Sequence, residues 1–390
     1  MSYKFTTLNK ILIVGISLFI MKAVLIVYPY FFSKEQYYNF NQNYFTASII
    51  IILASFGFNI SQSKLPVKKG LLFSLVLINA FFVTLGLLLI SGNVKVITFL
   101  TLIIYSTIIA FVGILNFRNI FYGNYIKYFL VILSMSTAHF LLIFFTHISN
   151  QFAVLSVIVL LWFVFINNYL DNVNTPSKKI KEYYKIGYSA LLMNSSVSVI
   201  LAGDKFLANH FFETGIANSY TFAWMFTAPL FYIGNLIEKF LFTETVINKR
   251  KILTKGIILS LILICLYVIL TFLLIRFFPA FLPSSVSQNY FTNIYVLMTA
   301  GYSIFVLFYF PLNSYIYKFC KTSALKNIGT VFTLVLAAYV LVFLIINGVA
   351  LKLTYVKLLI ITYSFVYILL FVKAVFIFKD QSKNLIIGYK

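Results

Sequence analysis

Charge is scarce in this sequence. Only 10% of its 390 residues are charged, and eight of them are acidic. The two cysteines and three histidines are too few and too scattered for a disulfide framework or a metal-ligand cluster, and the acids add no ligand set to them. The sequence therefore predicts no catalytic residues and no bound metal, and it argues against a hydrolase or a metalloenzyme.

Apolar residues are abundant instead, at 62% of the chain. A helix needs roughly 20 mostly apolar residues to cross the hydrocarbon layer of a bilayer, and runs of that length fill nearly the whole sequence. We therefore predict an all-α polytopic membrane protein. The first apolar run is long enough to span and shows no small-residue cleavage site, so we expect a retained helix and not a signal peptide.

The sequence predicts about twelve transmembrane helices, at residues 11–32, 44–60, 70–90, 96–115, 126–146, 152–170, 186–203, 216–236, 257–275, 290–312, 328–346 and 354–375. Most of the 30 Lys and Arg residues fall in alternate connections between these helices. Because basic residues concentrate in short cytoplasmic loops, we assign those connections and both termini to the cytoplasm. The net charge of +22 gives no reason to expect nucleic acid, since the basic residues do not gather on one soluble face.

The predicted helices divide into two halves. The longest cytoplasmic connection, at residues 171–185, follows the sixth helix, so we expect an N-terminal six-helix bundle at 1–177 and a C-terminal one at 178–390. The segments "FFSKEQYYNFNQNYFTAS" and "FFETGIANSYTFAW" follow the first and seventh helices and suggest an internal repeat, with coincidence as the alternative. The pairs that carry it are Asn43 with Asn218, Tyr44 with Tyr220 and Ala47 with Ala223.

Two stretches resemble a known family. The first, "KAVLIVYPYFFSKEQYYNFNQNYFTASIIIILASFGFNISQSK", has a helix with a proline near its end, a short acid-containing loop, and a second helix ending in Phe56 and Gly57. The second, "YYKIGYSALLMNSSVSVILAGDKFLANHFFETGIANSYTFAW", has Asp204 and Lys205 followed by a Gly-x-x-x-x-Tyr-x-x-Ala pattern. On these motifs the chain resembles the Wzx-type polysaccharide flippases, for O antigen or capsule, of the multidrug/oligosaccharidyl-lipid/polysaccharide exporter superfamily.

The resemblance implies a MATE-like fold of two six-helix bundles and a function in polysaccharide biosynthesis. The protein would move undecaprenyl-pyrophosphate-linked oligosaccharide from the inner to the outer leaflet of the bacterial cytoplasmic membrane by alternating access. Its partners would be the lipid-linked oligosaccharide and membrane lipids, with the polysaccharide polymerase machinery as a further candidate. Such a transporter needs no cofactor, and a coupling proton or sodium ion is compatible with it.

Lys22 is the best candidate for binding the phosphates of such a substrate. It lies 11 residues into the first helix, which is roughly 16 Å deep at 1.5 Å per residue. A charge at that depth usually faces a bundle interior or a watery cavity. The alternative is a shifted span, with Lys22 snorkelling along its own stem to the interface.

Polar residues in the other apolar helices are weaker candidates. Asn194 and Ser195 lie midway along the seventh helix and Asn293 and Tyr302 in the tenth; these are substrate-binding candidates, although small polar residues also serve helix packing. His139, near the middle of the fifth helix, could couple transport to protons. We favour a structural role for this histidine.

Other charges fall near the predicted helix ends. We expect Asp204 and Lys205 at the partly hydrated outer end of the seventh helix, as a structural pair or an outer gate. Adjacent residues on a helix do not face one another, so each should contact a different neighbour. Glu238 and Lys239 follow the eighth helix, and we expect them at the membrane interface.

Two other functions compete with the flippase. A drug or metabolite antiporter of the same superfamily would use an acid in the first helix for cation coupling, and that helix has Lys22 and no acid. An O-antigen polymerase or ligase, a membrane glycosyltransferase, needs an outside catalytic loop with ionisable groups. The longest predicted outside loop, "RFFPAFLPSSVSQN", has one charge.

The predicted orientation can be tested with reporter fusions. An enzyme that is active only outside the cytoplasm should be active when fused after Gly215 and inactive when fused after Lys249, because the charge distribution places these positions on opposite sides. Activity in the reverse pattern would show that the orientation is inverted.

Overall fold

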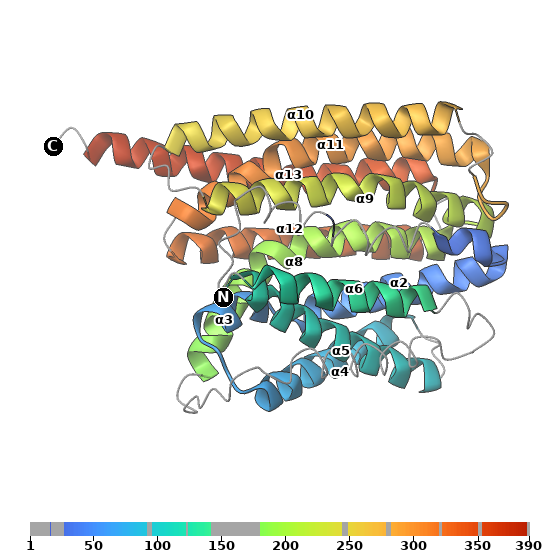
Figure 1. The fold of residues 1–390 in the computed structure, drawn as a ribbon, viewed down its shortest axis with the longest axis horizontal. Coiled ribbons are helices and arrows are strands. Elements are labelled where there is room, and N and C mark those ends of the chain that lie inside the picture. The colour runs from blue at the N-terminus through green and yellow to red at the C-terminus, as the bar shows by residue number, and fades with distance from the viewer. Residues whose placement is uncertain are drawn as a thin grey trace. The chain divides into compact units, whose positions relative to one another are not determined.

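The computed structural model describes residues 16, 27–91, 96–121, 124–141, 180–243, 249–277, 282–319, 322–349 and 353–387. These residues form α-helices, most of them long, as the composition predicts (Figure 1). The predicted helix at 152–170 and most of the one at 11–32 lie outside the described residues. The chain forms two compact units, residues 1–206 and 207–390. The expected boundary at 177/178 precedes α8 (Ile180–Phe211). The chain division between the two units, after residue 206, falls within that helix.

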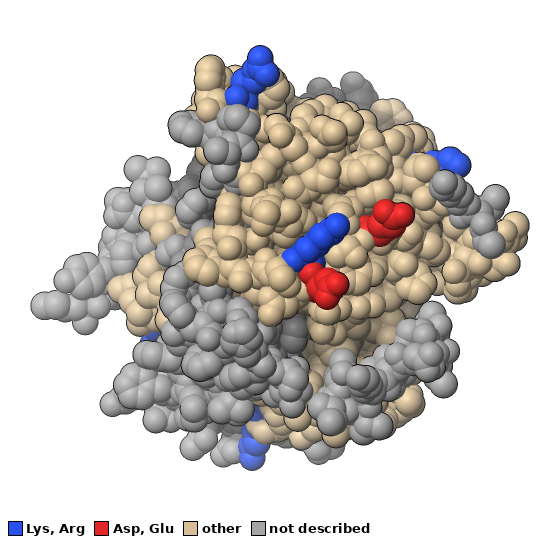
Figure 2. Space-filling view, turned by 90° about the vertical axis from the view of Figure 1, so that its right-hand side faces the viewer, with Lys and Arg blue, Asp and Glu red and all other residues tan. Residues whose placement is uncertain are grey.

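Six described segments are long and apolar enough to cross a bilayer, and the chain is a multi-pass membrane protein. They are Lys69–Leu87, Phe99–Phe117, Leu253–Phe277, Gln288–Ile316, Asn327–Gly348 and Tyr355–Phe378. The third lies in α10 (Lys249–Phe277) and exposes large apolar side chains along its length, among them Leu266 and Leu270. Figure 2 shows how few charged side chains interrupt the described surface at one end of the molecule.

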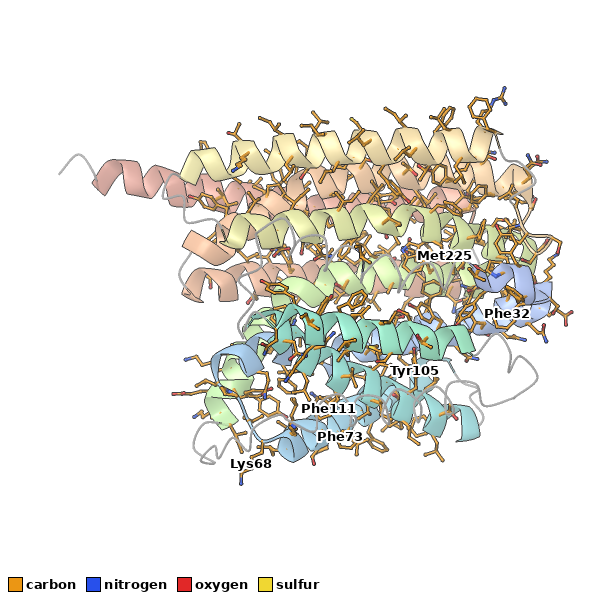
Figure 3. All side chains as sticks on the ribbon, in the orientation of Figure 1. Phe32, Lys68, Phe73, Tyr105, Phe111 and Met225 are labelled. Atoms are coloured by element: carbon orange, nitrogen blue, oxygen red, sulfur yellow. The ribbon has the colours of Figure 1, made fainter. Side chains whose placement is uncertain are left out.

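The first unit contains α2 (Lys34–Ala54), α3 (Phe58–Lys64), α4 (Lys69–Ser91), α5 (Val96–Phe121) and α6 (Tyr125–Leu141). Helix α5 is central among them, because α2, α3, α4 and α6 all pack against it. The rings of Phe73 on α4 and Phe111 on α5 meet edge to face, with centroids 5.4 Å apart (Figure 3). Tyr105 on α5 is also buried.

Helix α2 begins ten residues earlier than predicted. Ser33 and Gln36 form a capping box, in which each side chain accepts a hydrogen bond from the other residue's backbone N–H. This arrangement satisfies two N–H groups that a helix start leaves unpaired. The segment that the sequence suggested as a short acid-containing loop is therefore helical, and it buries Tyr37, Phe40 and Asn41.

The same helix ends at the expected Phe-Gly pair. Phe56 and Gly57 have positive φ angles of 45° and 67°, in the left-handed region that stops a helix. The chain then restarts as α3, which α8 holds in place: the Ser61 hydroxyl donates to the Tyr183 carbonyl at 2.8 Å. A Cβ atom on Gly187 of α8 would lie 2.8 Å from the Phe56 carbonyl oxygen, so this close approach needs glycine.

The two segments of the predicted internal repeat share one local feature in the structure. Phe32 and Phe212, 180 positions apart, each follow a helix and lie at a bend before the next one. Their rings lie 5.7 and 6.3 Å from those of Phe40 and Tyr220, each eight residues further on. The bends are 180 positions apart, whereas the predicted pairs are 175 or 176 positions apart. The repeat itself stays a prediction.

The second unit contains α9 (Thr214–Thr243), α10, α11 (Gln288–Phe319), α12 (Thr322–Gly348) and α13 (Tyr355–Ile387). Helices α9 and α11 share the most extensive contact, and α11 also packs on α10 and α13 (Figure 1). Each of α9 and α11 has an internal proline, Pro229 and Pro311. Gly234 allows the Phe310 ring to lie directly against the backbone of α9, since a Cβ there would be 2.1 Å from a ring atom.

Substituting this glycine should therefore loosen the second unit. We expect Gly234→Val to lower the free energy of unfolding by about 1–3 kcal/mol, the usual cost of overpacking a core. Gly86→Val on α4 is the control, because nothing lies within 4 Å of a Cβ atom at Gly86. Thermal unfolding of both variants in detergent measures the difference, and a Gly234→Val protein as stable as Gly86→Val would disprove the tight contact.

Candidate functional site

Several of the predicted site residues cannot be compared with the structure. Lys22 lies outside the described residues. His139 belongs to α6, and Asn194 and Ser195 to α8, as expected for membrane helices, but their side chains are also outside the described part. Their proposed roles remain predictions.

The two candidates on α11 do not share one surface. Tyr302 is buried, and its ring meets that of Tyr363 on α13 edge to face at 5.9 Å. Asn293 is exposed. The described structure therefore does not bring these two side chains together in a binding site.

Asp204 and Lys205 are in direct contact, which the sequence analysis did not expect. The Lys205 ammonium lies 2.7 Å from an Asp204 carboxylate oxygen and also donates to the Leu201 carbonyl one turn earlier. The long lysine side chain folds back along its own helix, so adjacent residues can meet. Both side chains are buried, and α8 continues to Phe211, so the pair lies inside the helix and not at a hydrated end.

A second buried charge lies in unit two, where the sequence analysis placed none. Lys373 on α13 is fully buried, and its ammonium donates to the Asn313 amide oxygen at 2.7 Å. The Asn313 amide nitrogen donates in turn to the Glu238 carboxylate at 2.7 Å. We call Glu238, Asn313 and Lys373 the interior triad, and it connects α9, α11 and α13.

Aromatic rings complete the surroundings of the lysine. The Lys373 ammonium lies 3.6 Å from the centroid of the Tyr309 ring and 5.4 Å from that of Phe332, close enough for cation–π attraction. Ser314, next to Asn313, donates to the Phe310 and Glu238 carbonyls at 2.9 and 3.4 Å. The buried ammonium is thus surrounded by an amide oxygen and two aromatic rings.

The triad corrects two expectations. Lys373 lies near the end of the predicted helix at 354–375, which we expected to reach the cytoplasmic side there, but the apolar span extends past it to Phe378. We placed Glu238 after the end of the eighth helix, but α9 runs past it to Thr243 and Glu238 is half-buried. The signals in the sequence were the lysine within the last apolar run and the Asn313–Ser314 pair just after Pro311.

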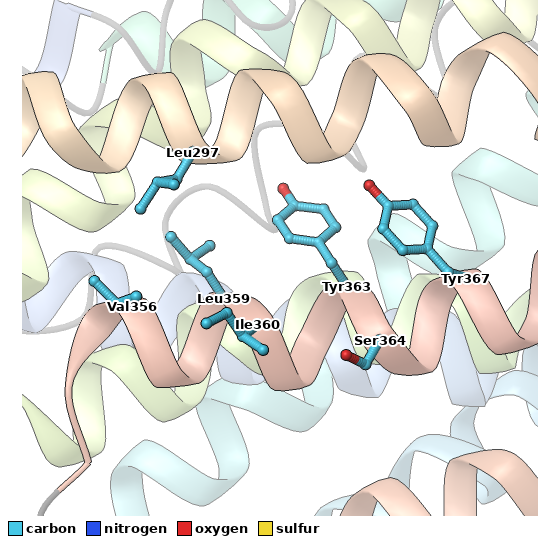
Figure 4. Close-up of a pocket in the computed structure, with 7 residues that line it drawn as sticks. All are labelled: Leu297, Val356, Leu359, Ile360, Tyr363, Ser364 and Tyr367. Carbon is cyan, nitrogen blue, oxygen red and sulfur yellow. The ribbon is translucent and has the colours of Figure 1, made fainter.

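A separate apolar groove lies along α13. Leu297 of α11 faces a row of α13 residues across it (Figure 4). Its volume is about 280 Å³. The α13 residues in the row are Val356, Leu359, Ile360, Tyr363, Ser364 and Tyr367.

The chemistry available in the described residues is binding and charge pairing. No group of three His, Cys, Asp or Glu side chains that could hold a metal ion occurs among them. Of the acids whose side chains are described, Asp204 and Glu238 are the two that are not exposed. Asp204 is paired directly with a lysine, and Glu238 is connected to one through Asn313.

Comparison with known proteins then gives the fold. No family model and no curated protein matches the sequence. An outward-facing multidrug resistance MATE family transporter of the MOP superfamily matches with a TM-score of 0.54 at 11% identity, over 97% of this chain and 98% of that one. The chain has the MATE fold. An inward-facing structure of such a transporter matches with a TM-score of 0.51 at 12% identity, over 93% and 94% of the two chains.

The interior triad can be tested through stability. We expect Glu238→Gln to destabilise the protein by about 3 kcal/mol, because breaking a buried ion network leaves the lysine charge uncompensated. Adding Lys373→Met should recover most of the loss, since it removes the stranded charge.

Thermal unfolding in detergent is the measurement. Glu182→Gln, at an exposed position of α8, is the matched control and should unfold with the unmodified protein. If Glu238→Gln unfolds at the same temperature as Glu182→Gln, the triad does not stabilise the unit.

Proposed function

We propose that this protein is a transporter that moves undecaprenyl-pyrophosphate-linked oligosaccharide from the inner to the outer leaflet of a bacterial cytoplasmic membrane. The MATE fold supports transport by alternating access, because the two similar structures are described as inward-facing and outward-facing transporters. In such a cycle the substrate site opens to each side in turn. No covalent chemistry is needed.

One observation supports the anionic substrate class. Both non-exposed acids of the described part, Asp204 and Glu238, already belong to networks with a lysine. A transporter of organic cations needs a carboxylate that its guest can pair with, since a buried charge without a partner is costly. Lys205 and Lys373 are committed to these acids in turn, so Lys22 of the first helix is the cation that the proposal offers to a guest, and the described interior has no uncommitted acid beside it. A diphosphate head group has the complementary charge.

The predicted residues then have distinct roles in the proposal. Lys22 would bind the diphosphate, while Asn194 and Ser195 would supply hydrogen bonds to the sugars. Tyr302 and Asn293 would reach the substrate only after rearrangement of α11, because one is buried against Tyr363 and the other is exposed. The multidrug activity named for the similar structures makes a drug antiporter the second candidate.

Complementation of a flippase-null bacterial strain tests the proposal. Lys22→Ala should reduce surface polysaccharide roughly tenfold or more, because a hydrogen bond to a charged group contributes about 1.5–3 kcal/mol. Lys22→Arg keeps the cation and should retain most of the activity. Lys34→Ala, at an exposed position of α2, is the control.

The amount of each variant in the membrane is measured alongside. Full activity of Lys22→Ala at normal abundance would eliminate Lys22 as the phosphate ligand. An unmodified protein that exports a cationic dye and never restores polysaccharide would favour the drug antiporter.

A further inference from the structure

Buried polar contacts hold together the end of the first unit where α3 lies. The Gln62 side chain of α3 is fully buried, and its amide exchanges two hydrogen bonds with the backbone of Val67, each at 3.1 Å, which fixes the turn into α4. The Tyr183 hydroxyl of α8 donates to the same amide at 3.2 Å, and its ring lies 5.0 Å from that of Phe58. Helix α3, the start of α4 and the start of α8 therefore form one packed body, which we call the α3 cap.

Lysines are exposed on the α3 cap. Lys68 directly follows the fixed turn, and its side chain extends away from the molecule (Figure 3). Lys181 and Lys185 are exposed on the first two turns of α8. Glu182 is the one acid in residues 58–72 and 180–188, so the cap carries a net positive charge.

These lysines lie where two membrane helices enter the bilayer. The span in α4 begins at Lys69, and the apolar run predicted at 186–203 begins directly after Lys185. Helix α8 has 32 residues, which is about 48 Å at 1.5 Å per residue, whereas the hydrocarbon core is roughly 30 Å thick. The first two turns of α8, which precede the apolar run, therefore lie in the head-group layer.

Tyrosine rings lie between the lysines and the apolar part of α8. Tyr184 and Tyr188 are one helical turn apart, and both rings contact that of Phe56, with centroids 5.5 and 6.3 Å apart. The Tyr188 side chain is 46% exposed. Tyrosine is enriched at the membrane–water interface, where one end of its ring is apolar and the other is polar. The order lysine, tyrosine, apolar residues along α8 matches the order phosphate, ester, acyl chain in a phospholipid.

We propose that the α3 cap binds the head groups of anionic phospholipids through Lys68, Lys181 and Lys185, with the Tyr188 ring beside the lipid ester groups. The lipid phosphate has the charge complementary to the lysines. Their position at the start of two membrane helices favours a lipid over an acidic soluble protein. The predicted orientation places this end at the cytoplasmic leaflet, which is rich in anionic lipid. This lipid belongs to the surrounding membrane, so the inference does not depend on the transported substrate.

Quenching of one tryptophan by brominated lipid tests the site. Tyr188→Trp, combined with Trp162→Phe and Trp224→Phe, leaves a single indole in the chain, on the α3 cap. The full-length protein is reconstituted in phosphatidylcholine vesicles that contain either phosphatidylglycerol or phosphatidylcholine brominated near the carboxyl end of the acyl chains. Quenching over a range of mole fractions should show at least a fivefold preference for phosphatidylglycerol, the factor expected for a single surface lysine. The preference should fall at high salt, which screens exposed charges.

Two double variants separate the cap from other exposed lysines. Lys68→Gln with Lys181→Gln should bring the binding of the two lipids close to parity. Lys34→Gln with Lys357→Gln removes the same charge from exposed positions of α2 and α13 and should leave the preference unchanged.

Three results would overturn the proposal. Equal binding of the two lipids with all lysines present would show that the cap does not select anionic lipid. An equal loss of preference in both double variants would show that net charge, and not the cap, attracts the lipid. The absence of quenching by either lipid would show that the cap lies outside the membrane, where an acidic soluble protein is the partner that its charge fits.

Discussion

A charge inside a membrane-spanning bundle must find its partner within the protein, because neither lipid nor bulk water can compensate it there. Each compact unit meets this constraint in its own way. In the first, Lys205 folds back along α8 onto Asp204 and the Leu201 carbonyl. In the second, Lys373 reaches Glu238 through the amide of Asn313, which joins three helices. The two solutions differ because one is local to a helix and the other requires tertiary packing.

Uncharged polar side chains satisfy the same constraint at a lower free-energy cost. Ser48, Thr84 and Ser136 each donate to the carbonyl four residues earlier in their own helix, at 2.6 to 2.8 Å. Such side chains need no partner from another helix. A serine or threonine in an apolar helix is therefore weak evidence for a binding site, whereas a buried lysine is strong evidence for a specific structural or functional role.

The sequence predicted some parts of the fold and missed others, for physical reasons that differ from element to element. Hydropathy identified the membrane class and most helices, since length and apolar content decide insertion. The Phe56–Gly57 break was predicted from the family resemblance, and Gly57 suits it because glycine adopts a positive φ without steric cost. The start of α2 was missed because the capping box of Ser33 and Gln36 outweighs the polar composition of that segment. The predicted repeat matched residue types 175 or 176 positions apart, while the bends at Phe32 and Phe212 lie 180 positions apart.

The interior triad could not be predicted from local sequence, because Glu238, Asn313 and Lys373 come from helices far apart in the chain. Its consequence for function concerns the charge of the substrate, because the described interior has no uncommitted acid with which a cationic guest could pair. The proposal of an anionic, lipid-linked substrate depends on this observation. The most direct test is reconstitution of the unmodified protein with fluorescent lipid-linked oligosaccharide. Protein-dependent transfer between leaflets without growth of the glycan is the predicted result, and glycan growth without transfer, or transport of an organic cation in place of the lipid, would contradict it.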